Sequence, residues 1–328
     1  MIEQSGQYKI VKYTSTYYSE WNVFIENSKN GTFLFQRDFM EYHKDRFEDF
    51  SLLVYFKKKL VCVLPANIYG NKIYSHQGLS YGGLILSNKS SFQVCKDSFY
   101  AILKFLFDQK ITTLFLKQLP KIYNVRPSDE LDYLFYILKA ESYRKDISMA
   151  IQLNTTYEFS TLRKRQLKRA IQNDLKVNLE TDLTSFWNNI LIPNLKTKHH
   201  TIPTHSLNEI KKLQAKFPNH IKQYNVYNGK KLLAGCTVFE TDSVAHLQYI
   251  STEKDENIGA LDYLVNYLIT KVYKNKNYFD FGISNENEGK NVNEGLLNWK
   301  QSFGASAVVH DFYKIQIANY PALNDVMI

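Results

Sequence analysis

The hydrophobic positions of the chain follow two periods, about 3.6 and about 2 residues, which are typical of amphipathic helices and half-buried strands. In the first half they predict two helices, three strands, a third helix and a fourth strand, at Tyr17–Asn27, Asp38–Phe47, Ser51–Phe56, Leu60–Ala66, Lys72–His76, Phe92–Lys110 and Thr112–Lys117. The polar residues Lys57–Lys59 form the turn of a hairpin. A loop containing Gly78, Gly82 and Gly83 follows the third strand.

The second half predicts the same order of elements. They lie at Leu183–Ile190, Leu207–Phe217, Ile221–Tyr227, Lys231–Thr241, Val244–Ile250, Ile258–Lys274 and Tyr278–Phe281. The hairpin in this half is joined by Asn228-Gly229, a dipeptide that strongly favours a tight turn. Trp21 and Trp187 lie 166 residues apart, and other matched positions are displaced by 165 to 171. We therefore predict a duplicated α/β unit with mixed sheets (α+β).

Composition supports two folded domains and an anionic partner. Of the 328 residues, 44% are hydrophobic and 15% aromatic, which is enough for two cores. The net charge of +9 favours a phosphate-bearing cofactor, a nucleotide sugar, RNA or a membrane surface, with a solvated basic surface as the alternative. The cysteines Cys62, Cys95 and Cys236 form no CxxC pair and are interpreted as small buried hydrophobes.

The sequence predicts neither a secretory signal nor a membrane span. Residues Met1–Tyr8 are polar, and no run approaches the roughly 18 apolar residues that cross a bilayer. We therefore expect a cytoplasmic protein, with peripheral membrane contact as an option. The sequence contains no P-loop, nucleophile elbow, HExxH motif or zinc-finger spacing.

Two candidate catalytic residues lie near the C-terminal end. Asp280 stands between two phenylalanines at the end of a predicted buried strand. A buried carboxylate must be paired, so it either caps a loop or binds a polar group. Lys300 follows Trp299 on a helix predicted over Val292–Phe303, where it would stabilise an oxyanion or hold a phosphate, unless it is an exposed helix lysine.

Two other stretches are suited to binding an anion. The loop Thr252–Gly259 precedes a helix whose first N–H groups attract negative charge, and Asn257, Gly259 and Ala260 are what remains there of a glycine-rich phosphate signature. The run Arg163–Arg169 holds five cations in seven residues on an amphipathic helix. Such a helix suits phosphates, RNA or anionic lipid, or it is simply solvated.

Three histidines lie close together in the sequence, at His199, His200 and His205. Without a nearby thiol or paired carboxylate they predict no metal site. His205 could contact substrate or act as a base. Ser206 with Glu209 predicts a helix start with a capping box. His76 and His246 fall on the third strands of the two halves, either as core residues or as polar residues aimed at a cleft.

Eight stretches carry a family resemblance: Phe33–Phe47, Leu64–Ala66, Tyr74–Gly83, Arg163–Val177, Pro203–Ser206, His246–Ile250, Phe279–Ser284 and Asn293–Gly304. They resemble the FemABX-like branch of the GNAT acyltransferase superfamily, in the versions found beside envelope polysaccharide genes. The resemblance implies two tandem GNAT-like domains, residues 1–150 and 151–310, that face each other across a substrate groove. It also implies that a tail, residues 311–328, returns to the first domain.

The resemblance adds roles for some of these residues. By that likeness Lys300 would sit at the donor end and stabilise the tetrahedral intermediate, and Asp280 and His205, singled out above from their sequence contexts, complete the expected catalytic group. The expected substrate-binding residues are Lys44, Lys168, Arg169, His76, Tyr81, Gln248, Tyr249, Asn293 and Trp299. Among these, Lys44 and the Lys168–Arg169 pair would hold an anionic acceptor such as a nucleotide diphosphate. The expected cofactor-binding residues are Asn257, Gly259 and Ala260, and no metal is expected.

The predicted function is N-acyl transfer from acyl-CoA, without a tightly bound cofactor, to an amine of an envelope or polysaccharide precursor such as an amino sugar. Family members in cell-wall synthesis instead move an aminoacyl group from tRNA to a peptidoglycan precursor. The chain lacks the long coiled-coil arm that such enzymes can use for tRNA, which favours a thioester donor, whereas the eroded Asn257–Ala260 signature argues against a standard CoA site. A non-catalytic binding protein is the third alternative. No DNA partner is expected.

Overall fold

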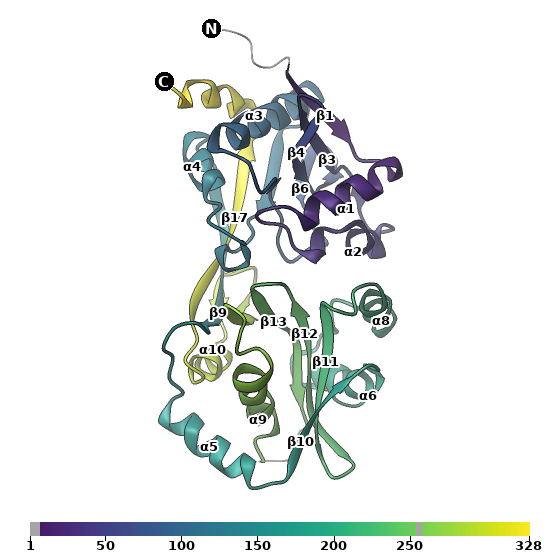
Figure 1. Cartoon of the computed structure of the whole chain (residues 1–328), viewed down its shortest axis with the longest axis vertical. Coiled ribbons are helices and arrows are strands. Elements are labelled where there is room, and N and C mark those ends of the chain that lie inside the picture. Colours follow the sequence, from purple (N-terminus) through teal and green to yellow (C-terminus); the bar gives the residue numbers. More distant parts are fainter. Residues whose placement is uncertain (1–6, 254–257) are drawn as a thin grey trace. The chain divides into compact units, whose positions relative to one another are not determined.

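A computed structural model describes residues 7–253 and 258–328. The chain forms two compact units, the first made of Met1–Lys145 with Val309–Ile328 and the second of Asp146–Val308. Two long strands run through the boundary, since β9 (Glu141–Gln152) begins in the first unit and β17 (Ser306–Gln316) begins in the second (Figure 1). The second unit is therefore one continuous stretch of chain, whereas C-terminal residues complete the first.

The first unit contains two sheets. One has the order β1-β3-β4-β7, with strands Tyr8–Lys12, Leu52–Phe56, Lys59–Leu64 and Ile85–Leu86. In the other sheet the first-unit part of β17 comes first, and β8, β6, β5 and β2 follow it in that order. These four strands are Thr113–Lys117, Lys72–Ser75, Asn67–Tyr69 and Glu48–Asp49. Strands β6 and β8 run parallel, and the other neighbours run antiparallel.

Within residues 7–145 and 309–328, four α-helices and five 3-10 turns accompany these sheets. The α-helices are α1 (Tyr18–Glu26), α2 (Arg37–Met40), α3 (Phe92–Asp108) and α4 (Glu130–Ile137). The 3-10 turns are Ser15–Tyr17, Phe33–Phe35, Glu41–His43, Lys121–Tyr123 and Ile317–Val326. Helix α3 begins where the Ser91 hydroxyl accepts the Val94 N–H at 3.3 Å, a typical N-cap. Ile317 and Leu323 of the C-terminal turn are fully buried in the same core as α3.

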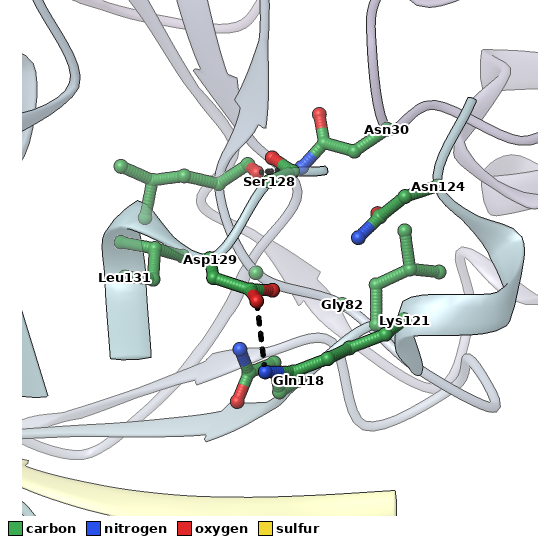
Figure 2. Close-up of a pocket in the computed structure, with 11 residues that line it drawn as sticks. Asn30, Gly82, Gln118, Lys121, Asn124, Ser128, Asp129 and Leu131 are labelled. Carbon is green, nitrogen blue, oxygen red and sulfur yellow. Dashed lines mark hydrogen bonds and ion pairs between the residues drawn. The ribbon is translucent and has the colours of Figure 1, made fainter. Parts of the chain in front are cut away.

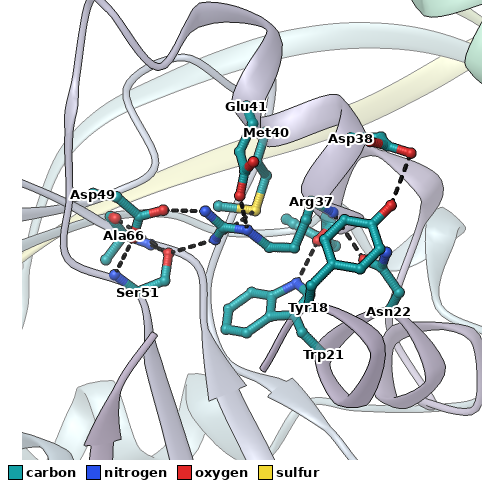
Figure 3. Close-up of polar contacts among 11 residues, drawn as sticks. Tyr18, Trp21, Asn22, Arg37, Asp38, Met40, Glu41, Asp49, Ser51 and Ala66 are labelled. Atoms are coloured by element: carbon teal, nitrogen blue, oxygen red, sulfur yellow. Dashed lines mark hydrogen bonds and ion pairs between the residues drawn. The ribbon is translucent and has the colours of Figure 1, made fainter. Parts of the chain in front are cut away.

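The single helix predicted over Asp38–Phe47 is wrong in extent. Helix α2 stops after one turn, and the 3-10 turn Glu41–His43 follows it. The buried Arg37 guanidinium donates to Glu41 Oε1 at 2.9 Å and to the Asp49 carboxylate (Figure 3). A buried guanidinium needs such acceptors, so the chain must turn back to bring Asp49 to it.

The second unit contains one main sheet, in which β10, β11, β12, β13, β14 and the second-unit part of β9 follow one another. The new strands are Leu175–Glu180, Ile221–Asn228, Lys231–Glu240, Val244–Thr252 and Tyr278–Ile283. The predicted hairpin is confirmed, but its turn lies one residue later than expected: Asn228 pairs with Lys231, and the turn residues are Gly229, with a φ of +56°, and Lys230. Strands β13 and β14 run parallel, and the other neighbours are antiparallel.

Helices cover this sheet, and a small hairpin precedes the last of them. The elements are α5 (Thr161–Ile171), α6 (Thr184–Phe186), α7 (Ile192–His199), α8 (Leu207–Lys216), α9 (Ala260–Tyr267), β15 (Asn285–Glu286), β16 (Asn291–Val292) and α10 (Glu294–Gln301). π turns at Trp187–Leu191 and Leu268–Val272 extend α6 and α9. The capping box at Ser206 and Glu209 is confirmed, and the helix predicted over Val292–Phe303 is two residues shorter at each end.

Both units place a helix between two parallel strands. The first unit has β6, then α3, then β8, and the second has β13, then α9, then β14. An antiparallel hairpin precedes the first strand of each pair, β3–β4 in one unit and β11–β12 in the other. The predicted duplication of a mixed α/β unit is confirmed at the level of topology.

Candidate active site

Strands β13 and β14 separate after three paired residues. Val244 lies opposite Tyr278, Ala245 opposite Phe279, and His246 opposite Asp280. Beyond this point β13 continues to Thr252 along β12, whereas β14 is paired with β9 and its register shifts before Ile283. We call the point where the strands part, with His246 on one arm and Asp280 on the other, the fork. At this point the polar side chains of His246 and Asp280 lie on the two strands just before their pairing ends.

Asp280 is fully buried and bound on both carboxylate oxygens. Its Oδ1 accepts the Ser148 hydroxyl at 2.6 Å and the Gly282 N–H at 2.9 Å, and its Oδ2 lies 2.9 Å from His246 Nδ1. These bonds compensate the cost of burying a carboxylate. Asp280 therefore both caps the bend at Gly282 and fixes a histidine ring.

Lys300 is 1% exposed, so the reading as an exposed helix lysine is wrong. Its Nζ donates to the carbonyl oxygens of Gly282 and Ile283, each at 2.7 Å. Burial lowers the pKa of Lys300 to about 8, and the charge of Asp280 opposes that change. An ammonium has three N–H donors, and two of them tie α10 to the end of β14. The third has no hydrogen-bond partner among the described residues.

His205 and Tyr249 form a second polar contact in this unit. The Tyr249 hydroxyl lies 2.6 Å from His205 Nδ1 and accepts the His205 backbone N–H at 3.2 Å. Burial raises the pKa of Tyr249 to about 12, and the His205 N–H opposes that change. The His205 ring also contacts Phe239, which lies opposite His246 in the sheet register. Residues directly opposite in a pair share a face, so this contact lies on the His246 face of the sheet.

Strand β13 has a bulge just past the fork. Leu247 lies opposite Val238 and Tyr249 opposite Thr237, which leaves Gln248 without an opposite residue. A bulged residue disrupts the ladder and re-aims nearby backbone groups. The bulge lies two residues from His246, on the arm that leaves β14.

The start of α9 lies against α5. Gly259 has a φ of +73°, and a Cβ built on it would lie 3.4 Å from the Ala170 Cβ of α5. Ala260, the first residue of α9, is buried. The backbone N–H groups in the first turn of α9 attract anions. Asn257, the third residue that we expected to bind the cofactor, lies outside the described residues.

The basic run on α5 divides into an inward and an outward part. Arg163 is buried, forms an ion pair with Asp262 of α9, and donates to the Ser302 hydroxyl at 2.9 Å. Lys168 and Arg169 are exposed. Arg163 therefore attaches the helix, while the other two remain accessible to an anion.

Two residues predicted to bind substrate have structural contacts around α10. The Asn293 side chain accepts the Leu296 N–H at 3.0 Å, which makes it the N-cap of the helix. Trp299 donates its indole N–H to Asp262 Oδ1 at 2.9 Å and packs against Phe303 with the ring centroids 5.2 Å apart. Both side chains help to hold α10, and with it Lys300, in place.

In the first unit, two of the predicted substrate contacts are buried. His76 accepts a backbone N–H on Nδ1 at 3.1 Å, and its pKa is lowered to about 3, first by burial and then by neighbouring His43. Tyr81 donates to the Thr32 hydroxyl at 3.2 Å. Lys44 is exposed. Among these three predicted residues, Lys44 is the one that solvent reaches freely.

A small polar pocket lies where β6 and β8 end in the first unit (Figure 2). It is lined by Asn30, Gly82, Gly83, Leu84, Gln118, Leu119, Lys121, Asn124, Ser128, Asp129 and Leu131. The space for the centre of a water-sized molecule is about 10 Å³, which suits one water and no larger group. Gly82 forms a bridge with Gln118, and its N–H donates to the Lys117 carbonyl at 2.7 Å. The counterpart of the fork in this unit is therefore closed by a loop.

The sequence analysis missed Ser148 and Asp262, which position Asp280 and Trp299 respectively. Ser148 lies in the run 147–153, in which every second residue is a large hydrophobic one, and a small polar residue within such a run was the available signal. The role of Asp262 depends on α5 and α10 meeting α9, which no local pattern shows. Within the part of the chain that the structure describes, no group of three or more His, Cys, Asp or Glu could hold a metal, and no helix is long and apolar enough to cross a membrane.

Comparisons with known proteins identify the fold. No family model and no curated protein matches the chain. Among solved structures it is similar to FemX, with a TM-score of 0.66 and 10% identity over 97% of this chain and 99% of that one. It is also similar to the C-terminal domain of a putative lysylphosphatidylglycerol synthetase from Agrobacterium fabrum, with a TM-score of 0.54 and 10% identity over 81% and 84%.

A third similar structure is a conserved protein of unknown function from Bacteroides thetaiotaomicron, with a TM-score of 0.54 and 9% identity over 94% and 99%. At identities this low the likeness establishes the fold and nothing finer. The match to FemX covers nearly the whole chain, so the resemblance drawn from the sequence is confirmed at the level of fold.

Proposed function

We propose that this chain is an acyltransferase that moves an acyl group from an activated donor to an amine at the fork of the second unit. The observation that carries the proposal is the separation of β13 and β14 beyond His246 and Asp280. A donor lying along the free edge of β13 would bring its carbonyl to the side chains of the fork. The fold shared with FemX supports this reaction class.

The donor would be held by the start of α9. Gly259 is the N-cap and Ala260 the first residue of a helix whose first N–H groups suit a phosphate. Acyl-CoA is therefore the donor that we propose first.

The acyl carbonyl would be polarised by two kinds of donor. A backbone N–H at the Gln248 bulge lies outside the regular ladder and can point at an oxyanion. The remaining N–H of Lys300 supplies positive charge, since a lysine with a pKa of about 8 is mostly protonated at neutral pH. Asp280 would act by holding this end of β14 and the His246 ring in place.

The acceptor that we propose is an amine of a phosphate-bearing envelope or polysaccharide precursor, such as a nucleotide-linked amino sugar. Exposed Lys168 and Arg169 on α5, in the same unit as the fork, are suited to its phosphates. His205 and Tyr249 provide polar groups on the His246 face for the sugar or peptide portion.

One observation favours a second donor, aminoacyl-tRNA. Arg165, Lys168 and Arg169 are exposed on α5, and none of them forms an ion pair with another described residue. Such a rigid row of cations also suits an RNA backbone. Treatment of a crude assay with ribonuclease would abolish transfer from aminoacyl-tRNA and leave transfer from acetyl-CoA unchanged.

The proposal is tested by measuring thiol release from acetyl-CoA in the presence of a panel of amines, with aminoacyl-tRNA tested in parallel. Replacing Lys300 by Met should lower kcat/KM by about 10²- to 10³-fold, because an oxyanion donor is lost. Lys276→Met is the matched control, since Lys276 also donates to a backbone carbonyl in this unit, at 2.6 Å.

Equal turnover by wild type and Lys300→Met would remove Lys300 from the mechanism. No transfer from either donor to any amine would contradict the proposed function. A thermal shift with CoA thioesters or nucleotide sugars in that case would instead support the non-catalytic binding protein.

A further inference from the structure

We infer that His246 is the group that takes the proton from the attacking amine, with Asp280 as its positioning residue. The inference rests on the proposed function, because it names the base of the same site. It starts from the geometry of the Asp280–His246 contact at the fork and from the way in which the neighbouring polar groups are already occupied.

The His246 ring is held by one nitrogen and leaves the other available. Nδ1 lies 2.9 Å from Asp280 Oδ2, while Nε2 has no hydrogen-bond partner among the described residues. The side chain is 19% exposed, in contrast to the fully buried Asp280. A basic nitrogen thus reaches solvent at the last paired residue of β13, where the two strands part.

The position of Asp280 determines which His246 nitrogen is basic. A carboxylate oxygen only accepts, so the proton of neutral His246 lies on Nδ1 and the lone pair lies on Nε2. Asp280 itself cannot rotate away, because Oδ1 is held by Ser148 at 2.6 Å and by the Gly282 N–H at 2.9 Å. The carboxylate also stabilises the imidazolium that forms when Nε2 takes a proton.

Other titratable groups of the fork are less suited to this role. Both oxygens of Asp280 are already bound, and it is closed to solvent. Lys300 is mostly protonated at neutral pH and uses two of its donors on carbonyl oxygens. His205 is buried, and its Nδ1 is bound to the Tyr249 hydroxyl. His246 is the remaining side chain at the fork with an accessible lone pair on nitrogen.

The transfer step balances with these residues alone. The amine lone pair forms the C–N bond, the carbonyl electrons move to oxygen, and an amine proton passes to His246 Nε2. The tetrahedral intermediate then re-forms the carbonyl, and the bond from carbon to the leaving sulfur or oxygen breaks. The leaving atom takes the proton from His246, so amide and thiol (or alcohol) are formed and neutral His246 is restored.

The tautomer can be tested without any substrate. In the full-length chain labelled with ¹⁵N-histidine, the neutral form of the His246 ring should carry its proton on Nδ1 and leave Nε2 unprotonated. In Asp280→Asn the amide can donate to Nδ1, so the proton should move to Nε2. A wild-type ring with its proton on Nε2 would overturn the inference.

The catalytic role is tested with His246→Gln and with His220→Gln as the matched control. His220 lies in the same unit, is half-buried, and has its Nδ1 2.7 Å from the Glu240 carbonyl oxygen. With acetyl-CoA and the best amine, His246→Gln should lower kcat about 10²- to 10⁴-fold and leave the KM for acetyl-CoA unchanged. His220→Gln should retain wild-type rates.

A variant that preserves folding separates a chemical from a structural effect. His246→Gly should lose activity and regain part of it when free imidazole is added. Asp280→Asn should lower kcat without changing the KM for acetyl-CoA. Wild-type kcat in His246→Gln overturns this inference alone, whereas a wild-type chain that acylates no amine overturns the proposed function as well.

Discussion

Asp280 and Lys300 are two ionisable side chains, nearly or fully buried, that meet at the same bend. Lys300 donates to the Gly282 carbonyl, and Asp280 accepts the Gly282 N–H. Buried charges are costly unless hydrogen bonds and an opposite charge compensate them. Each side chain therefore depends on the other, and the backbone of Gly282 connects them.

Lys300 should make stability depend on pH in a defined window. Its folded pKa is about 8, below the ordinary value of 10.5, so between these values the unfolded chain holds more protons. The free energy of unfolding should therefore rise with pH across this window, by about 2 to 3 kcal/mol relative to Lys300→Met. Urea denaturation of both proteins at pH 7.5 and pH 10 measures the difference, and a parallel pH dependence would contradict it.

Gly282 should resist replacement for two separable reasons. Its φ is +75°, and an added Cβ would lie 3.2 Å from His246 Cε1. Gly282→Ala should cost about 1 to 2 kcal/mol and also displace the histidine ring, which lowers acyl transfer. Gly229→Ala is the control, because its φ is +56° and nothing lies within 4 Å of the added Cβ. The control should lose a similar amount of stability and keep its activity.

The sequence predicted Asp280 and Lys300 as functional residues but not their surroundings. A carboxylate between two phenylalanines must find partners, and that requirement can be read locally. The identity of the partners cannot, because His246 reaches Asp280 through a parallel pairing 34 residues away in the chain. Arg163 shows the same limit, since its neighbours in the basic run suggest solvation while Asp262 and Ser302 draw it inward.

At the scale of elements, helix α5 packs on its neighbours with one side and presents basic residues to solvent with the other. Its buried side, through Arg163, joins α9 and α10 by way of Asp262 and Ser302. The Arg163 guanidinium also lies over the Phe303 ring, 4.3 Å from its centroid. The exposed cations are therefore presented from a helix that is firmly held.

Arg163→Ala should lower the free energy of unfolding by about 2 to 3 kcal/mol, because the partly buried partner Asp262 is left without its cation. Arg165→Ala, on the exposed side of the same helix, should change it by less than about 0.5 kcal/mol. Chemical denaturation followed by circular dichroism compares the two variants. Equal stability of both would show that α5 is not held through Arg163.

Elements were predicted well where local chemistry sets their ends. The hairpin turn at Gly229 and the Ser206–Glu209 capping box each fix a boundary within a few residues. The stretch Asp38–Phe47 failed because its shape depends on Arg37, whose guanidinium lies 3.6 Å from the centroid of the Tyr13 ring, between Glu41 and Asp49. A helical period alone cannot show that a buried cation requires the chain to turn.

At the scale of the whole molecule, the two units differ in how the chain builds them. The second unit uses the continuous stretch Asp146–Val308, whereas the first needs Val309–Ile328 as well. These last residues supply a strand paired with β8 and three core side chains, Ile315, Ile317 and Leu323. Two units with the same order of core elements can thus differ in how many separate stretches of chain they need.

Fragments should show this inequality directly. A fragment of residues 146–308 should give a cooperative thermal transition, because its core is complete. A fragment of residues 1–145 should not, because Ile315, Ile317 and Leu323 are missing and each contributes about 1.5 to 3 kcal/mol when buried. Adding a peptide of residues 309–328 to the fragment of residues 1–145 should restore the cooperative transition. A stable fragment of residues 1–145 alone would contradict this account.

The return of the C-terminal segment also has a consequence for synthesis on the ribosome. Domains generally fold as they emerge, starting from the N-terminal end. Here the strand partner of β8 is made after the whole second unit, so the edge of β8 and the hydrophobic surface around α3 stay uncovered while that unit is translated. The unit encoded later is the one that can finish first, and the nascent first unit needs protection from aggregation until residues 309–328 have emerged.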